Sequence, residues 1–200
     1  MTVKLVGSTS GSVSLQAPAS TTGGAHRVLT LPDVDGTIAT TATAGGLYAS
    51  YALLADIKAN SVAGGGTLTS GDWRTRDLNT ELHDADGIVS ISSNQFTLQA
   101  GTYRIAATTP SYQTDRHQAA LYNVTDSSYV QFGPVAYTNN NDNITTESFL
   151  RTRFTISGAK VFELRHRAQT TEATYGFGVG LANYWTGSSI FAVVEIFKEN

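Results

Sequence analysis

The sequence predicts an all-β protein, and three observations lead to that prediction. In residues 72–200, short segments alternate apolar and polar side chains at the strand period of two, and turn residues separate them about every 10 residues. No helical period of useful length survives among them. Charged residues are only 14% of the 200-residue chain, and small neutral polar residues replace them, as suits an extracellular β surface. Many short, evenly spaced strands predict a β-sandwich with a jelly-roll type of closure.

Residues 1–46 are predicted to form a β-rich N-terminal arm that attaches the protein to an assembly. Large apolar side chains are sparse here, so the arm cannot bury a core of its own. Three copies winding together, or docking on a partner, would supply the missing burial. The alternation at period two predicts short strands in this arm at 3–6, 12–16, 27–31 and 37–40.

Residues 47–59 are predicted to form one short helix. Alanine and leucine favour helix, and Leu47, Tyr51 and Leu54 keep a spacing of three to four residues on one face. A helix of this length is marginal on its own and needs a partner surface. It either forms a neck between chains or lies on the β domain.

The glycine-rich residues 60–67 are typical of a flexible linker. A helix-and-linker section, 47–71, therefore separates the arm from a jelly-roll tip domain, 72–200. The strands expected in the tip are 73–79, 88–92, 95–99, 101–109, 117–123, 129–133, 147–156, 160–168, 175–179 and 190–197.

The last of these strands is apolar on both faces. One face carries Ile190, Ala192, Val194 and Ile196, and the other carries Phe191, Val193, Glu195 and Phe197. A strand buried on both faces is central in a stack, but one sandwich covers only one face. We expect further copies of the chain to cover the other face, in a homotrimer whose interface contains Phe191, Val193 and Phe197. A covering loop from the same chain is the alternative.

Several segments resemble phage tail-fibre proteins. In the tip, 73–80, 96–105, 116–124 and the closing residues 190–198 resemble the C-terminal domains of that group. Those domains are similar to the trimeric jelly roll of complement-type globular heads and tumour-necrosis-factor ligands, which share a Leu-x-Ala-Gly-Thr-Tyr step into a core strand, here 98–103. The arm segments 12–18, 29–32 and 35–38 resemble the repetitive N-terminal stretches of marine phage fibres.

The resemblance implies a homotrimer at the surface of a phage virion. Residues 1–60 would bind other virion proteins, and the tip would project outward and contact a glycan or protein of the host cell. Two other functions stay open: a capsid decoration or head fibre with no dedicated receptor, and a small polysaccharide hydrolase. Multivalent binding would let weak individual sites give useful avidity in the first case.

Composition and charge weigh against several classes of function. The net charge is −3 and no basic cluster is present, which argues against nucleic-acid binding. No segment approaches the roughly 18 apolar residues that membrane insertion requires. Cysteine is absent, so the chain has no disulfide framework and no thiolate metal site.

The sequence carries no catalytic signature, and we expect no enzyme, metal or cofactor. None of the four histidines lies in a Gly-x-Ser-x-Gly elbow, and we expect His117 and His166, which lie within predicted strands, to be structural. Glycoside hydrolysis needs two carboxylates across a cleft, whereas the acidic residues here are scattered. The Asp-x-Asp-Gly stretches at 33–36 and 84–87 lack the later ligands of a calcium loop and are predicted to be turns.

The best candidate for ligand binding is an asparagine-rich loop, residues 137–143. Amides and carboxylates beside aromatic rings suit saccharides, which offer hydroxyl groups and apolar faces. Tyr112 and Tyr175 lie near strand ends and could add rings. An ordinary polar loop without a ligand is the alternative. The expected ligand-binding residues are Tyr137, Asn139, Asn141, Asp142, Tyr184 and Trp185.

Overall fold

The computed structural model describes residues 2–6, 12–16 and 46–200, which belong to two separate units, Met1–Thr40 and Thr41–Asn200. In the first unit, β1 (Thr2–Val6) and β2 (Ser12–Gln16) form an antiparallel pair. These two strands of the arm are confirmed. The strands predicted at 27–31 and 37–40 lie outside the described residues.

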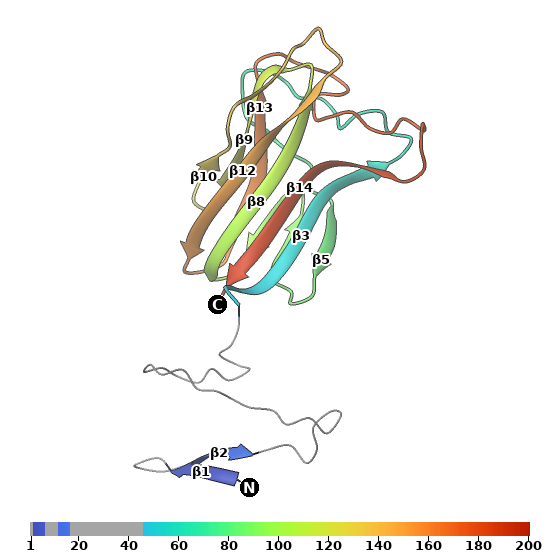
Figure 1. The fold of residues 1–200 in the computed structure, drawn as a ribbon. Coiled ribbons are helices and arrows are strands. Elements are labelled where there is room, and N and C mark those ends of the chain that lie inside the picture. Colours follow the sequence, from blue (N-terminus) through green and yellow to red (C-terminus); the bar gives the residue numbers. More distant parts are fainter. Residues whose placement is uncertain (1, 7–11, 17–45) are drawn as a thin grey trace. The chain divides into compact units, whose positions relative to one another are not determined.

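The second unit is a sandwich of two antiparallel sheets, which Figure 1 shows face to face. The five-stranded sheet has the order β12 (Thr145–Ile156), β8 (Gly101–Tyr112), β14 (Ser188–Glu199), β3 (Tyr48–Ala59) and β5 (Thr80–Asp84). The seven-stranded sheet has the order β10 (Ser128–Phe132), β9 (Asp115–Asn123), β13 (Lys160–Ala168), β7 (Gln95–Leu98) and β6 (Val89–Ser92), with β11 (Ala136–Thr138) on β9 and β4 (Arg74–Thr75) on β13. Neighbours come from distant parts of the chain, as in a jelly roll.

The core lies between the two sheets, where alternate residues of each strand point inward. Phe96 and Phe162 of the seven-stranded sheet stack with ring centroids 5.7 Å apart. Burial of each large apolar side chain stabilises the fold by about 1.5–3 kcal/mol. The five-stranded sheet contributes Leu54, Tyr103, Ile105, Leu150, Val194 and Ile196 to the same core.

The helix expected at 47–59 is wrong, because this segment is strand β3. It pairs with β14 on one side and β5 on the other. Ala52 and Leu54 point into the core, whereas Leu53 between them is only partly buried, so the segment also fits a period of two. Helix propensity is a weak preference, and pairing on both sides overrides it.

The linker expected at 60–67 is also wrong, because these glycines are packed inside the second unit. The N–H of Gly65 donates to the Gly178 carbonyl at 2.9 Å, and the N–H of Gly66 donates to Thr174 at 3.0 Å. A Cβ on Gly65 would lie 2.7 Å from the Phe177 carbonyl oxygen. The glycines serve close approach of two backbones, so the jelly-roll unit begins before β3 and not at residue 72.

Most strands expected in the tip are confirmed, with four exceptions. β5 and β11 were not predicted, and the strand expected at 73–79 shrinks to the two residues of β4. Residues 175–179 form no strand and contribute one isolated bridge, between Val179 and Gly64. In the described part of the chain, no helix is long and apolar enough to cross a membrane.

Both ends of the described jelly roll lie at one end of the sandwich. The N–H of Asn200 donates to the Leu47 carbonyl at 3.4 Å, and Figure 1 shows the C-terminus beside the start of β3. Strand β14 runs antiparallel to β8, and Lys198 near the C-terminus lies opposite Tyr103 near the start of β8. The other end of β8, at Tyr112, therefore lies far from the C-terminus. A strand of 12 residues spans about 40 Å.

Candidate functional site

Four aromatic rings from separate segments line one hollow of about 420 Å³ at the end of the sandwich opposite the C-terminus. We call it the aromatic hollow. Its rings come from the end of β8 and from the long connection between β13 and β14. Its lining includes Tyr112, Tyr175, Tyr184 and Trp185, together with Ala63, Val179, Gly180, Leu181 and Ala182.

Contacts within the chain orient two of these rings. Tyr112 and Tyr175 meet edge to face, with centroids 5.6 Å apart. The hydroxyl group of Tyr112 donates to Oδ1 of Asn143 at 2.7 Å, so an amide is fixed beside the rings. This combination presents an apolar wall next to a polar group.

The other two rings project from a tight turn. Ala182 and Asn183 both have positive φ, 48° and 66°, a conformation that non-glycine residues adopt rarely. The carbonyl of Trp185 accepts from Nδ2 of Asn60 at 3.2 Å. Tyr184 is 82% exposed and Trp185 is 72% exposed. Large rings held out in solvent by a strained turn are a common feature of binding sites.

The expected ligand-binding residues divide between two places. Tyr184 and Trp185, which the sequence suggested as ligand-binding residues, line the aromatic hollow. Three expected residues of the asparagine-rich loop instead bond to one another: Oδ1 of Asn139 accepts from the N–H of Asn141 at 2.9 Å, and the N–H of Asp142 donates to the Asn139 carbonyl at 3.1 Å. Only Asn143, at the end of this loop, bonds to a ring of the hollow. Tyr137 is exposed on β11, and its ring centroid lies 6.0 Å from the Arg116 guanidinium.

The sequence missed the part of the hollow formed by Ala63, Val179 and Leu181. Ala63 adjoins the glycine run taken as a linker, and Val179 lies in a segment taken as a strand. The run of three glycines was the available signal, since it also permits close packing of two backbones.

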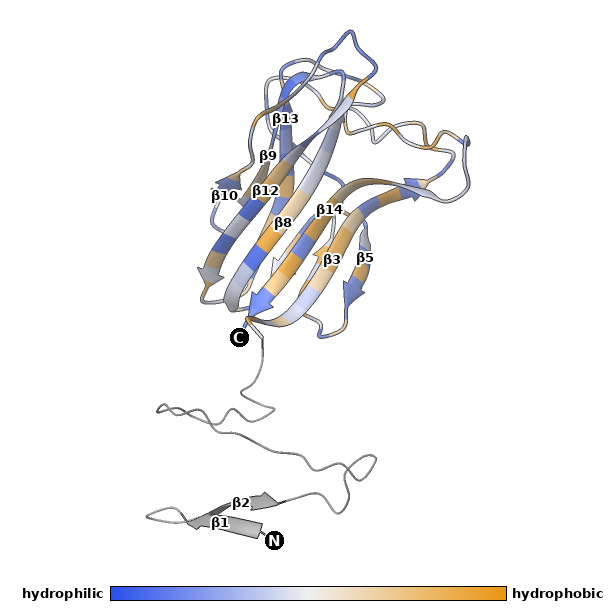
Figure 2. Ribbon diagram, in the orientation of Figure 1, coloured by the Kyte–Doolittle hydropathy of each residue, from blue (hydrophilic) through white to orange (hydrophobic). Residues whose placement is uncertain are grey.

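The outer face of the five-stranded sheet is a second candidate surface. One row across the sheet joins Phe149, Thr108 and Val193, and the next joins Arg151, Ala106 and Glu195. Phe197 packs against Tyr48 and Tyr51 on this face, with both ring centroids 5.0 Å away. Figure 2 shows hydrophobic residues along β3, β8 and β14. Val193 and Phe197 lie on this face, and Phe149 is 45% exposed at its edge.

Phe191 does not share that face, which corrects its expected place in an interface. The pairing of β14 with β3 shifts between Ile190 and Ala192, so the alternation inverts at this bulge. Phe191 turns inward, is 1% exposed, and packs against the backbone at Gly65 and Gly178. Its cover comes from loops of the same chain.

Both histidines singled out in the strands belong to a buried chain of hydrogen bonds. Arg76 has only donors, so Nδ1 of His166 must accept from its Nη1 at 3.3 Å. His166 then donates from Nε2 to Nδ1 of His117 at 2.9 Å. Nε2 of His117 donates to Thr146 at 2.8 Å, and Thr146 donates to the Tyr137 carbonyl at 3.1 Å. Both imidazoles are neutral in this arrangement.

Burial sets the charges along this chain. Arg76 is fully buried, and its guanidinium donates to the carbonyls of Pro110, Phe177 and Phe191. Desolvation lowers the pKa of Arg76 to about 9. Desolvation, followed by the charge of Arg76, lowers the pKa of His117 to about 4 and that of His166 well below its ordinary value. These histidines support the sandwich from inside.

Within the described residues, no group of three His, Cys, Asp or Glu side chains is placed to hold a metal ion. The Asp84 stretch is a turn: its two carboxylate oxygens accept from the N–H groups of Ile88 and Val89, both at 2.9 Å. Gly87 has a φ of 64°. The stretch at 33–36 lies outside the described residues.

No protein-family model and no curated protein sequence matches the chain. Among solved structures, it is similar to murine APRIL at pH 8.0, with a TM-score of 0.48 and 6% identity over 74% of this chain and 98% of that one. It is also similar to the globular domain of zebrafish complement 1qA protein, with a TM-score of 0.45 and 14% identity over 74% and 95% of the two chains. The jelly-roll assignment rests on the strand order of the chain itself.

Proposed function

We propose that this chain is a phage virion fibre protein whose jelly-roll head assembles as a homotrimer and binds the host-cell surface through the aromatic hollow. One observation carries the binding role. Four rings meet at the end of the sandwich opposite the C-terminus, and two of them are held in solvent by a strained turn. Saccharides stack their apolar faces on such rings and bond their hydroxyl groups to amides such as Asn143.

The outer face of the five-stranded sheet supports the trimer. The edge strand β12 presents Phe149 and Arg151, whereas Val193, Phe197 and Glu195 lie nearer the middle of the sheet. If the β12 edge of one copy packs on the outer sheet face of the next copy, Phe149 of the first copy covers Val193 of the second. Arg151 of the first copy then lies near Glu195 of the second. An interface that joins an edge to a face closes into a ring when three copies complete the rotation.

Attachment to other virion proteins belongs to the residues before Gly46 in this proposal. The expected docking segment extended to residue 60, but residues 48–59 are strand β3, which pairs with β14 and β5 in the head. Strands β1 and β2 pair as a two-stranded sheet, and in this proposal a partner sheet would extend that pair through its backbone edges. With this attachment, the head would lie at the surface of the virion.

Binding by the full-length chain to immobilised bacterial surface polysaccharides tests the proposal. We expect Tyr184→Ala and Trp185→Ala each to weaken binding about tenfold, because a stacked ring contributes about 0.5–1.5 kcal/mol and three sites act together. Leu82→Ala, an exposed apolar residue on β5, is the matched control and should bind unchanged. Unaltered binding by both aromatic variants would remove the hollow from the proposal.

The same assay separates the two alternative functions. Release of reducing ends from the polysaccharide would replace the binding role with hydrolysis. Failure of the full-length chain to bind any bacterial surface, with the chain still incorporated in the virion, would favour a capsid decoration.

A further inference from the structure

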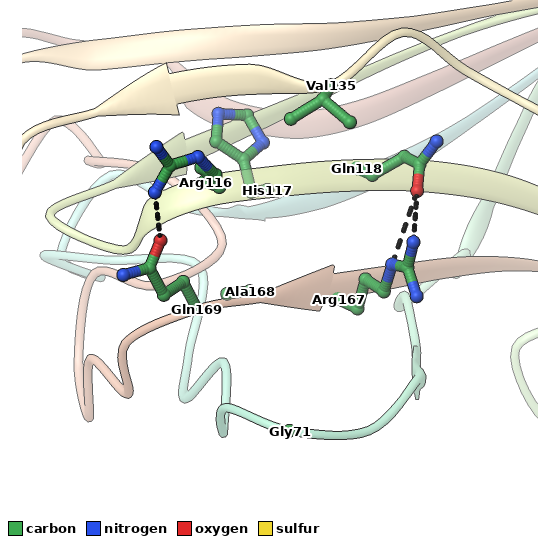
Figure 3. Close-up of a pocket in the computed structure, with 8 residues that line it drawn as sticks. All are labelled: Gly71, Arg116, His117, Gln118, Val135, Arg167, Ala168 and Gln169. Atoms are coloured by element: carbon green, nitrogen blue, oxygen red, sulfur yellow. Dashed lines mark hydrogen bonds between the residues drawn. The ribbon is translucent and has the colours of Figure 1, made fainter.

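Two arginines and two glutamines face one another across β9 and β13, as Figure 3 shows. Nη1 of Arg116 donates to Oε1 of Gln169 at 2.9 Å. Arg167 donates to Oε1 of Gln118 from Nε at 3.2 Å and from Nη2 at 2.8 Å. A cleft of about 380 Å³ lies among these four side chains, and we call it the arginine cleft. Its lining has no residue in common with that of the aromatic hollow.

The two guanidinium groups are oriented without being neutralised. Amide oxygens hold Arg116 and Arg167, and neither side chain forms an ion pair within the part of the chain that the structure describes. Arg165 differs, since its Nε meets the Glu163 carboxylate at 2.5 Å. A guanidinium has five N–H donors, so most donors of this pair stay free for a ligand.

The acidic residues next to the cleft are engaged elsewhere. Asp115 accepts from the hydroxyl group of Thr170 at 2.5 Å and from the N–H of Asn140 at 3.2 Å. Oδ1 of Asp72 accepts from the N–H of Trp73 at 2.7 Å. These carboxylates do not line the cleft, whose charged lining residues are Arg116 and Arg167, so an anion inside it would meet two positive charges.

Apolar surfaces lie beside these charges. The Arg167 guanidinium stacks 4.7 Å from the Trp73 ring, and Val135 and Tyr137 are exposed near Arg116. We propose that the arginine cleft binds the carboxylate or sulfate group of an acidic saccharide. The two guanidinium forks would hold the oxyanion, and the neighbouring rings would contact the sugar face. This site is additional to the aromatic hollow and stands without it.

Calorimetric titration of the full-length chain with three oligomers of equal length tests this inference: a galacturonate oligomer, a sulfated galactose oligomer and a neutral galactose oligomer. We expect at least one charged oligomer to bind at least tenfold more tightly than the neutral one, and added salt to weaken that binding. Arg116→Gln and Arg167→Gln should each raise Kd about tenfold, the equivalent of one charge-assisted pair.

Controls separate a site from general charge attraction and from misfolding. Lys160→Gln removes one positive charge at the opposite end of β13 and should leave Kd unchanged. Arg116→Lys keeps the charge but loses the fork, and its Kd should fall between those of the original chain and Arg116→Gln. Thermal unfolding at an unchanged midpoint verifies the fold of each variant.

Three outcomes would overturn the inference. They are equal binding of neutral and charged oligomers, an equal effect of Lys160→Gln and the two arginine substitutions, and tighter binding of inorganic sulfate than of either charged oligomer. The Tyr184→Ala and Trp185→Ala variants test the aromatic hollow separately, so failure here leaves the proposed function standing.

Discussion

Arg76 illustrates how single residues hold this fold together. Its guanidinium lies in the core and contacts no carboxylate of the described residues. It bonds instead to three backbone carbonyls and lies 4.4 Å from the Phe177 ring. These carbonyls belong to the end of β8, the long loop and β14, so one side chain joins three segments. Removal of such a partner leaves buried carbonyls unsatisfied, at a cost of about 1–3 kcal/mol each.

The histidine pair predicts a loss of stability in mild acid. The folded-state pKa of His117, about 4, lies below the ordinary 6.5, so the unfolded chain takes up the proton first as the pH falls. The contribution of neutral His117 to the free energy of unfolding is fully present above about pH 6.5 and is lost as the pH falls toward 4. For His117 alone, the free energy of unfolding should fall by about 2 kcal/mol between pH 7 and pH 5. Urea unfolding at these two pH values measures it. The His117→Gln variant should show a smaller decline, and an equal decline would contradict this role.

At the scale of elements, close backbone approach decides how the loops pack. Gly65 and Gly66 are hydrogen-bonded to residues 174–178, and Gly64 forms an isolated bridge with Val179, more than 100 positions later in the chain. The sequence shows the glycines but not what approaches them. For that reason the same run was interpreted as a flexible linker.

Gly65→Ala should destabilise the protein by about 1–3 kcal/mol. The new Cβ would lie 2.7 Å from the Phe177 carbonyl oxygen and 2.8 Å from the Phe191 ring, so packed groups would have to move. Gly158→Ala is the control, since nothing lies within 4 Å of its Cβ position. Denaturant unfolding compares the two variants. Equal midpoints would show that the close packing at Gly65 does not contribute to stability.

At the scale of the whole molecule, the uncovered face of the five-stranded sheet raises the question of assembly. The two apolar faces of the last strand predict a second cover for it, and this prediction holds for some of its residues and fails for Phe191. The bulge at 190–192 turns Phe191 to the inside, where loops of the same chain cover it. Val193 and Phe197 stay on the outer face, so a homotrimer remains the proposal for them.

Light scattering on the full-length chain tests the trimer. We expect a mass of three times 21.2 kDa for the unaltered chain. Val193→Glu should yield a folded monomer, because it places a charge beside Glu195 at the centre of the proposed contact. Glu81→Lys on the far edge strand β5 is a control that should remain trimeric. A monodisperse monomer at high concentration for the unaltered chain would contradict the edge-to-face interface.

The sequence by itself determined the all-β class and most strands of the jelly roll, because alternation at period two reflects which face of a strand is buried. It also named Tyr184 and Trp185 as candidate ligand-binding residues, with Tyr112 and Tyr175 as further rings. Only the tertiary structure decided that residues 47–59 are a strand, since pairing with β14 and β5 overrides local propensity. It alone brought the four rings of the aromatic hollow together, because contacts between residues distant in the chain leave no local pattern.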